Sequence, residues 1–161
     1  MIDLRSIEVR SYLAQEGYEV KIYSRPTPTS FAAAEVIGCS VAEIAKSVLM
    51  LVGQQPVLVV TSGDTRVKSS RLKQVTGLRG QVRLPSPDEV MCYTGYSPGA
   101  VSPFLLPDDL PVLIDRSLQR FMVVYPAGGS GNSAVAMKLN RLQELCNGQL
   151  VNVCDKQESQ V

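Results

Sequence analysis

The sequence predicts a mixed α/β domain of the α+β kind, in which helices flank a largely antiparallel, barrel-like sheet. Three observations lead to this prediction. Most apolar segments are short and alternate with polar residues, as strands do. Several of them are separated only by tight turns, which join antiparallel neighbours. The helical segments lie between them without the regular strand–helix alternation of a parallel sheet.

The N-terminal third contains two predicted helices and one strand. Apolar residues recur at helical spacing between positions 4 and 13, and Gly17 is a typical C-terminal stop. Residues 18–23 alternate and predict a strand. Thr29 or Ser30 can cap a helix over residues 31–37, which Gly38 ends.

A hairpin is predicted next. A short helical segment over residues 41–44 leads into a strand over 45–52. The tight connection at 53–55 joins it to a second strand over 56–62, and Gly63-Asp64 turns the chain.

The remaining elements are short. A helix over 69–75 ends at Gly77, a strand covers 81–84, and Ser86-Pro87 opens another helix. Further along, the predicted elements are strands at 112–115, 121–125 and 134–137, a helix capped by Asn140 that stops at Gly148, and an edge strand at 150–153.

The composition is that of one domain with an apolar core. Of the 161 residues, 45% are hydrophobic and 19% are charged. We expect a single domain over 1–161 with a polar tail from about 155 to 161. The net charge of +1 provides no global attraction to nucleic acid or to a membrane. A run of basic residues between positions 66 and 83 is either a local phosphate-facing surface or a solvated face: Arg66, Lys68, Arg71, Lys73, Arg79 and Arg83.

Residue types that are missing or few restrict the chemistry. The chain has no histidine, which excludes Ser-His-Asp and Cys-His catalysis and histidine-liganded metals. The cysteines form no C-x-x-C pair and are expected to be reduced and mostly buried: Cys39, Cys92, Cys146 and Cys154. With no signal-like segment and no membrane-length apolar run, we expect a cytoplasmic protein without membrane contact.

Lys46 is the first candidate site residue. In a strand over 45–52 its side chain shares a face with Val48, Met50 and Val52, which are all apolar. A cation at the end of a buried stripe is costly without a partner, so a phosphate, carbonyl or ribose hydroxyl could bind there. A lysine whose stem packs on apolar neighbours while its ammonium reaches water explains the pattern equally well.

Two loops are the other candidates. Residues 94–104 contain glycines, which permit close backbone approach, and prolines, which stiffen the segment. This composition is consistent with a rigid pocket wall, and it is also consistent with an ordinary connecting loop. The glycine-rich segment 125–132 matches neither a P-loop nor a dinucleotide fingerprint. We expect it to be a hairpin loop that borders the pocket.

Several motifs occur in an order that resembles the YbaK/prolyl-tRNA synthetase-associated editing-domain family, from about residue 25 to 147. They are Thr29, Ala33-Ala34 and Gly38, then Ile44-Ala45-Lys46-Ser47, Ser62-Gly63-Asp64, Thr94-Gly95-Tyr96, Gly99-Ala100-Val101-Ser102-Pro103, Ile114-Asp115 and Ala127-Gly128. Ala127-Gly128 stands where some members place a histidine.

The resemblance implies a free-standing aminoacyl-tRNA deacylase with a barrel-like mixed sheet and no metal or other cofactor. Its implied substrate is mischarged tRNA, typically tRNA(Pro) carrying alanine or cysteine, and prolyl-tRNA synthetase is a further implied partner. Lys46 corresponds to the catalytic pocket lysine, which holds the 3′-terminal adenosine end or the ester. The wall around the aminoacyl group corresponds to Gly99, Ala100, Val101, Ser102 and Pro103.

The remaining candidate substrate-binding residues are Thr29, Gly95, Asp115 and Gly128, although Asp115 at a strand end is equally consistent with a structural role. An aminoacyl ester is already activated, so positioned water, a neighbouring 2′-OH or a cysteine thiol of the substrate could replace a histidine base. Two alternatives remain. One is a non-catalytic module on the same fold that binds a small ligand or the tRNA 3′ end. The other is an interaction protein without a cavity beside Lys46.

Overall fold

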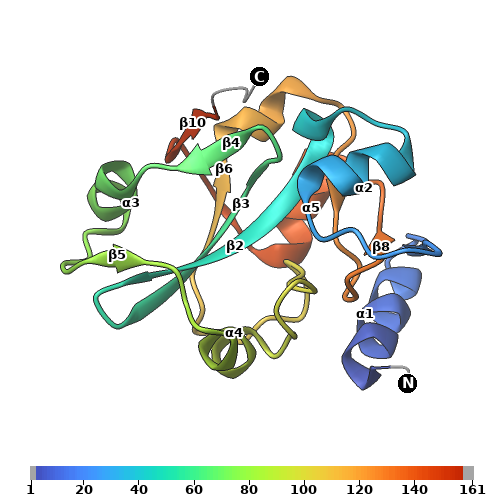
Figure 1. The fold of residues 1–161 in the computed structure, drawn as a ribbon, viewed down its shortest axis with the longest axis horizontal. Coiled ribbons are helices and arrows are strands. Elements are labelled where there is room, and N and C mark those ends of the chain that lie inside the picture. The colour runs from blue at the N-terminus through green and yellow to red at the C-terminus, as the bar shows by residue number, and fades with distance from the viewer. Residues whose placement is uncertain (1–2, 158–161) are drawn as a thin grey trace.

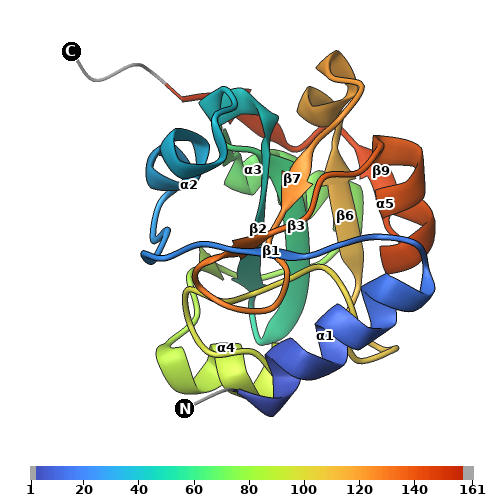
Figure 2. The ribbon, with the colours of Figure 1, turned by 90° about the vertical axis from the view of Figure 1, so that its right-hand side faces the viewer.

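An open, six-stranded mixed sheet organises the molecule, as the computed structural model shows for residues 3–157 (Figures 1 and 2). The strands lie in the order β5 (Val82–Arg83), β2 (Ile44–Val52), β3 (Gln55–Ser62), β6 (Val112–Asp115) and β9 (Gln149–Val151), and β7 (Tyr125–Pro126) pairs with β2 beside this path. The mixed α/β class is therefore confirmed. The described residues form no closed barrel, because β9 ends the sheet on one side and β5 and β7 end it on the other.

The predicted hairpin is the centre of this sheet. β2 and β3 pair antiparallel from Ala45 opposite Ser62 to Val52 opposite Gln55. On its other edge, β2 pairs with β5 in antiparallel and with β7 in parallel orientation. β6 pairs parallel to β3, and β9 pairs parallel to β6. The sheet thus contains more parallel pairing than the expectation of a largely antiparallel sheet allowed.

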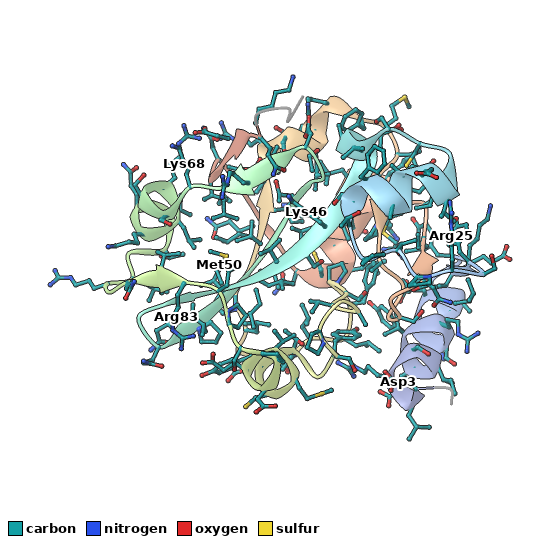
Figure 3. The ribbon with its side chains drawn as sticks, viewed as in Figure 1. Asp3, Arg25, Lys46, Met50, Lys68 and Arg83 are labelled. Carbon is teal, nitrogen blue, oxygen red and sulfur yellow. The ribbon has the colours of Figure 1, made fainter. Side chains whose placement is uncertain are left out.

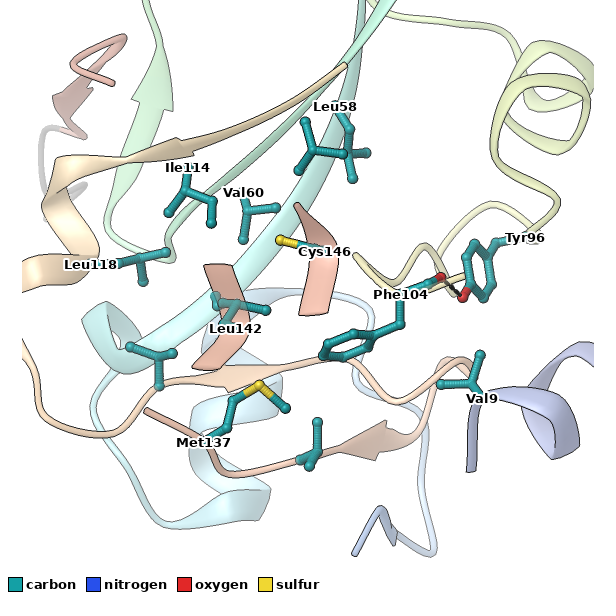
Figure 4. Packing of buried hydrophobic residues seen from close by; sticks show 14 of the residues in the cluster. Val9, Leu58, Val60, Tyr96, Phe104, Ile114, Leu118, Met137, Leu142 and Cys146 are labelled. Atoms are coloured by element: carbon teal, nitrogen blue, oxygen red, sulfur yellow. Dashed lines mark hydrogen bonds between the residues drawn. The ribbon is translucent and has the colours of Figure 1, made fainter. Parts of the chain in front are cut away.

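Apolar side chains cover the sheet on both faces. One cluster joins residues of β2, β3 and β6 to the helices α1 (Leu4–Gln15), α4 (Pro87–Thr94) and α5 (Leu139–Cys146), as Figure 4 shows in close-up. Within it, Tyr96 and Phe104 are fully buried, and the Tyr96 hydroxyl donates to the Phe104 carbonyl. The second cluster packs Leu72 of α3 (Ser69–Thr76) against Met50, Val52 and Val59.

Local capping explains most helix boundaries. The Thr29 hydroxyl caps α2 (Ser30–Ile37) by accepting the Ala32 N–H, and Gly38 ends that helix in the left-handed region. A 3₁₀ turn, η1 (Val41–Glu43), then leads into β2. Ser86 and Glu89 form a reciprocal capping box at the start of α4.

Some expected elements differ from the structure. The strand expected over 18–23 is reduced to β1 (Lys21–Ile22), whose exposed residues pair only with β8 (Ser133–Ala134). The strand expected over 121–125 is reduced to an isolated bridge between Val124 and Met137 and to the first residue of β7, and a second 3₁₀ helix, η2 (Arg116–Arg120), precedes it. Asn140 does not cap α5, because the helix starts at Leu139 and its N-cap is Lys138.

The C-terminal segment also differs from the expected tail. β10 (Cys154–Lys156) pairs antiparallel with β4 (Thr65–Val67), a strand that the sequence did not predict. Residues 155 and 156 are therefore part of a sheet, while 158–161 lie outside the described residues. No helix among residues 3–157 combines the length and apolar character that crossing a membrane requires.

Candidate functional site

A cavity of about 540 Å³ lies beside the start of β2. Its volume is within the range of small-molecule sites, ~300–1,000 Å³. We call it the Lys46 cavity. It is lined by residues 27–31 and by Ala33, Ile37, Val41, Ile44, Ala45, Lys46, Ser47, Gly63, Gly99, Val101, Tyr125, Ala127, Ser130, Ser133, Ala134 and Gln157.

The sheet leaves space for this cavity at one edge of β2. On one edge of β2, β7 pairs with residues 44–45 and β5 pairs with residues 51–52. Between these two pairings, β2 has no strand partner on this edge among the described residues, and it pairs only with β3 on the opposite edge. Lys46 and Ser47 begin this open stretch, and both line the cavity. α2 and η1 pack beside the same end of β2.

Lys46 lies at the end of an apolar stripe, as its alternation with Val48 and Met50 predicts (Figure 3). Its Nζ donates a hydrogen bond to the Thr65 carbonyl of β4. Burial lowers the pKa of the ammonium below its ordinary value of 10.5, while nearby Cys154 and Asp64 act in the opposite direction. An ammonium that has lost part of its hydration interacts strongly with an electron-rich group placed beside it.

A hydroxyl network fixes the carbonyl that Lys46 contacts. The Thr61 and Thr65 hydroxyl oxygens are 2.6 Å apart, and the Thr65 hydroxyl also donates to the Ser62 carbonyl at 2.8 Å. Beside this turn, Arg120 forms an ion pair with Asp64 at 2.8 Å. These contacts hold the β3–β4 turn in place and thereby orient the Lys46 side chain.

The 99–103 segment contributes its first half to the cavity. Gly99, with a φ of 85°, and Val101 are on the lining. Ala100 is buried outside the lining, and Pro103 borders a different cavity of about 400 Å³. Ser102 is fully buried and donates from Oγ to the Ala127 carbonyl at 2.7 Å. Ser102 therefore ties this wall to the 127–133 loop.

The 127–133 loop forms the facing wall. Ser133 Oγ accepts the N–H groups of Gly128 at 3.1 Å and Ser130 at 3.2 Å. Gly128 itself lies behind the lining, where a Cβ would come within 2.3 Å of the Val20 Cγ1. Thr27 donates from both its N–H and its hydroxyl to the Gly131 carbonyl, at 2.8 and 3.0 Å. The loop is thus held in place by hydrogen bonds within it and by the hydrogen bonds from Thr27.

The structure does not bring every candidate residue to the cavity. Thr29 lines it, although its hydroxyl is engaged in capping α2. Gly95 is the left-handed C-cap of α4 and lies against Arg5. Asp115 is buried at the end of β6, where its carboxylate accepts N–H groups of Ser117, Val153 and Cys154 at 2.9–3.1 Å.

Two lining residues received no role from the sequence. The Ser47 Oγ is buried and has no hydrogen-bond partner among the described atoms. Its neighbour Lys46 was the only signal that could have identified it. Phe31 also lines the cavity, but nothing in the sequence distinguishes its ring from a core residue of α2.

Half of the basic residues between 66 and 83 are paired. Lys68 and Arg71 form ion pairs with Asp155 at 3.3 and 2.8 Å, and Arg83 pairs with Glu89 at 2.8 Å. The fold thus neutralises half of the run, which sequence order could not reveal because Asp155 lies far along the chain.

The chemistry of the cavity depends on one charge. Among the described residues that line it, Lys46 is the only charged side chain, and hydroxyl groups and backbone make up most of the polar remainder. Such a site can stabilise negative charge that develops on a bound carbonyl oxygen. The described lining contains no carboxylate to act as a base, so water or the substrate must accept the proton that the attacking nucleophile releases.

Comparisons with known proteins agree on one family. The model of the aminoacyl-tRNA editing domain matches residues 24–145. The uncharacterized protein YwhH of Bacillus subtilis (strain 168) is 37% identical over 150 residues, which cover 91% of this chain and 94% of YwhH. The proline–tRNA ligase of Limosilactobacillus fermentum is 28% identical over 113 residues, 65% of this chain but only 20% of the ligase.

Solved structures share the fold over nearly the whole chain. The crystal structure of a "putative trans-editing enzyme for prolyl tRNA synthetase" superposes with a TM-score of 0.85 at 25% identity, covering 96% of this chain and 99% of that one. The "hypothetical protein APE2540" gives a TM-score of 0.80 at 28% identity, covering 93% and 99%.

Proposed function

Because this chain belongs to the aminoacyl-tRNA editing domain family, we propose that it is a free-standing deacylase that hydrolyses the ester of mischarged tRNA. The proposed substrate is tRNA(Pro) that carries alanine or cysteine. Support comes from the similarity to an editing enzyme described for prolyl-tRNA synthetase and to proline–tRNA ligases. The reaction would take place in the cytoplasm, where charged tRNA and prolyl-tRNA synthetase meet.

The observation that carries the proposal is the single charged side chain on the cavity lining. Lys46 presents an incompletely hydrated ammonium beside a rigid wall that contains Gly99 and Val101. In the proposed complex, the ester carbonyl oxygen lies against this ammonium and the aminoacyl group lies against the wall.

The proposed step is the addition of water to the ester carbonyl carbon. Lys46 stabilises the negative charge that develops on the carbonyl oxygen. The bond between the carbonyl carbon and the ribose oxygen then breaks, and a proton from the attacking water reaches that oxygen through water or the adjacent ribose hydroxyl. For a cysteinyl ester, the substrate's own thiol can attack the carbonyl carbon first. The ribose oxygen then leaves and takes up the thiol proton, and water opens the resulting cyclic thioester to give free cysteine. This role for the substrate accounts for a lining without a histidine or carboxylate base.

Selectivity against proline would be steric. Gly99, Val101 and Ala127 place backbone and small side chains around the space for the aminoacyl group. The internally bonded 127–133 loop resists the widening that a pyrrolidine ring would require. Because one methylene changes affinity only about 10- to 200-fold, size separates alanine from cysteine poorly. We therefore expect overlapping activity on both.

The experiment is a deacylation panel with purified protein and tRNA(Pro) charged with alanine, cysteine, serine or proline. We expect hydrolysis of the alanyl or cysteinyl ester and little hydrolysis of the prolyl ester. Lys46→Ala should lower kcat by about 10²- to 10³-fold, the usual effect of losing one group that stabilises an oxyanion. Lys138→Ala is the matched control, because Lys138 is exposed and lies outside the lining.

Two outcomes would contradict the proposal. Full activity of Lys46→Ala would remove this residue from the mechanism. Tight binding of a non-hydrolysable aminoacyl-adenosine, without turnover of any charged tRNA, would instead indicate a binding module on the same fold.

A further inference from the structure

Phe31 is an aromatic side chain that the fold leaves in solvent at the cavity. It is 69% exposed although it belongs to the cavity lining. Seven other large apolar side chains are exposed among residues 3–157, but none of them is aromatic and none lines this cavity: Leu4, Ile7, Ile22, Val75, Leu84, Met91 and Met122. An exposed ring that also lines a cavity presents an aromatic face to any ligand bound there.

The helix that carries Phe31 is held firmly. The Thr29 hydroxyl caps its first turn at 3.0 Å from the Ala32 nitrogen. The preceding Ser30 packs on Gly63, where an added Cβ would come within 2.8 Å of the Ser30 Cβ. α2 lies at the periphery of the molecule, next to the start of β2 (Figure 2). The backbone that carries the ring is therefore held in place beside the cavity, while Lys46 lies on β2.

We propose that Phe31 is a stacking platform for the adenine base of the terminal nucleoside, an inference that rests on the proposed deacylase function. If the ester carbonyl contacts Lys46, the ribose that carries it must also lie in the cavity. The base on that ribose is then one sugar away from the ester, towards the opening. Every base has an aromatic face, and Phe side chains stack on such faces in single-stranded nucleic-acid sites. The 540 Å³ of the cavity accommodates a nucleoside together with a small aminoacyl group.

Stacking at the rim should affect binding and leave the chemical step unchanged. The base is distant from the bond that breaks, so its contact is equal in the ground and transition states. Loss of such a contact raises KM and leaves kcat unchanged. The effect should also be the same for alanyl and cysteinyl substrates, because both carry the same terminal adenosine.

The first test measures KM and kcat for variants of Phe31. Phe31→Ala should raise KM about 5- to 150-fold, as expected for one stacked base. Phe31→Tyr should retain the wild-type KM, and Phe31→Leu should behave like Phe31→Ala, because leucine is apolar but has no ring. Leu84→Ala is the control: Leu84 is 68% exposed and lies outside the lining. An unchanged KM in Phe31→Ala would overturn the proposal.

The second test observes the stacking directly. The chain has no tryptophan, so Phe31→Trp introduces a single tryptophan at the proposed site, which can be excited at wavelengths where the six tyrosines do not absorb. Uncharged tRNA(Pro) ending in its terminal adenosine should quench this fluorescence, and the same tRNA without that nucleotide should quench much less. Leu84→Trp should not distinguish the two. Equal quenching of Phe31→Trp by both tRNAs, or no quenching by either, would overturn the proposal.

These tests separate the two proposals. If the wild type hydrolyses charged tRNA while Phe31→Ala keeps its KM, the stacking inference fails alone. If no charged tRNA is hydrolysed but quenching of Phe31→Trp requires the terminal adenosine, the proposed hydrolysis fails and the stacking inference stands.

Discussion

Replacing Asp115 should lower the stability of the fold and should not remove a substrate contact. Asp115 is only 2% exposed, and its carboxylate accepts three backbone N–H groups, from Ser117, Val153 and Cys154. One of these bonds caps the start of η2, and the other two connect the end of β6 to Val153 and to the first residue of β10. Asp115 thus joins the β6–η2 junction to a segment almost forty residues further along the chain.

The size of the effect follows from those three bonds. A hydrogen bond to a charged group contributes about 1.5–3 kcal/mol, and each buried N–H left without a partner adds a desolvation cost. Because the three bonds share one carboxylate, their losses do not simply add. We expect Asp115→Ala to lower the free energy of unfolding by about 3–5 kcal/mol. This is a large part of the ~5–15 kcal/mol that stabilises a typical domain.

Urea denaturation measures this loss. With a slope of about 2 kcal/mol per molar urea, the midpoint of Asp115→Ala should fall by roughly 2 M. Asp115→Asn should lose less, about 1–2 kcal/mol, because the amide oxygen can still accept from Val153 and Cys154 while the NH₂ group cannot accept from Ser117. Asp109→Ala, at an exposed aspartate, should stay within about 0.5 kcal/mol of the wild type. An unchanged midpoint for Asp115→Ala with lost deacylation would refute this reasoning and place Asp115 in the substrate site.

Two further predictions follow from the cavity. Because burial lowers the pKa of Lys46 below 10.5, deacylation that needs the ammonium should decline in the alkaline range below that value, after correction for spontaneous ester hydrolysis. Over the same range the unfolded state binds more protons than the folded state, so this group's contribution to stability should rise with pH. Lys46→Arg, which stays charged, should lack the alkaline decline, and a decline of the same shape in that variant would assign it to another group. Gly128→Ala should lower the unfolding free energy by about 1–3 kcal/mol, because the new Cβ would lie 2.3 Å from the Val20 Cγ1. Gly131→Ala should be nearly neutral in thermal unfolding, because its new Cβ would lie 3.5 Å from the Gly99 carbonyl oxygen, an ordinary contact distance. Equal losses in both variants would contradict the packing argument.

Local sequence signals predicted the hairpin and most helix ends. The alternation along 45–52 and the turn at Gly53 correctly give β2 and β3, and with them the place of Lys46 at the end of an apolar stripe. Thr29 and Gly38 correctly bound α2. These features depend on residues within a few positions of each other, so the sequence alone contains the information.

Long-range pairing was less predictable. β4 is a three-residue strand that exists because β10 pairs with it, and β10 lies almost ninety positions further along the chain. The parallel partners of β3 and β6 likewise come from distant segments. A short strand has little pattern of its own, and its conformation is decided by the partner that satisfies its backbone hydrogen bonds.

For the site, the sequence by itself determined that a lysine lies at the end of the apolar face of a strand. It also determined that stiff loops follow this strand, with their motifs in the order found in the editing-domain family. The tertiary structure decided which of those residues share a cavity: Gly99 and Val101 meet Lys46, while Gly95 caps a helix and Asp115 braces the scaffold. It also left Phe31 exposed at the rim and Ser47 without a partner. The physical reason is that the burial of a side chain and its hydrogen-bond partners depend on how the whole chain packs. Segments distant in sequence compete for the same neighbours, and the spacing of residues along the sequence does not show which of them makes the contact.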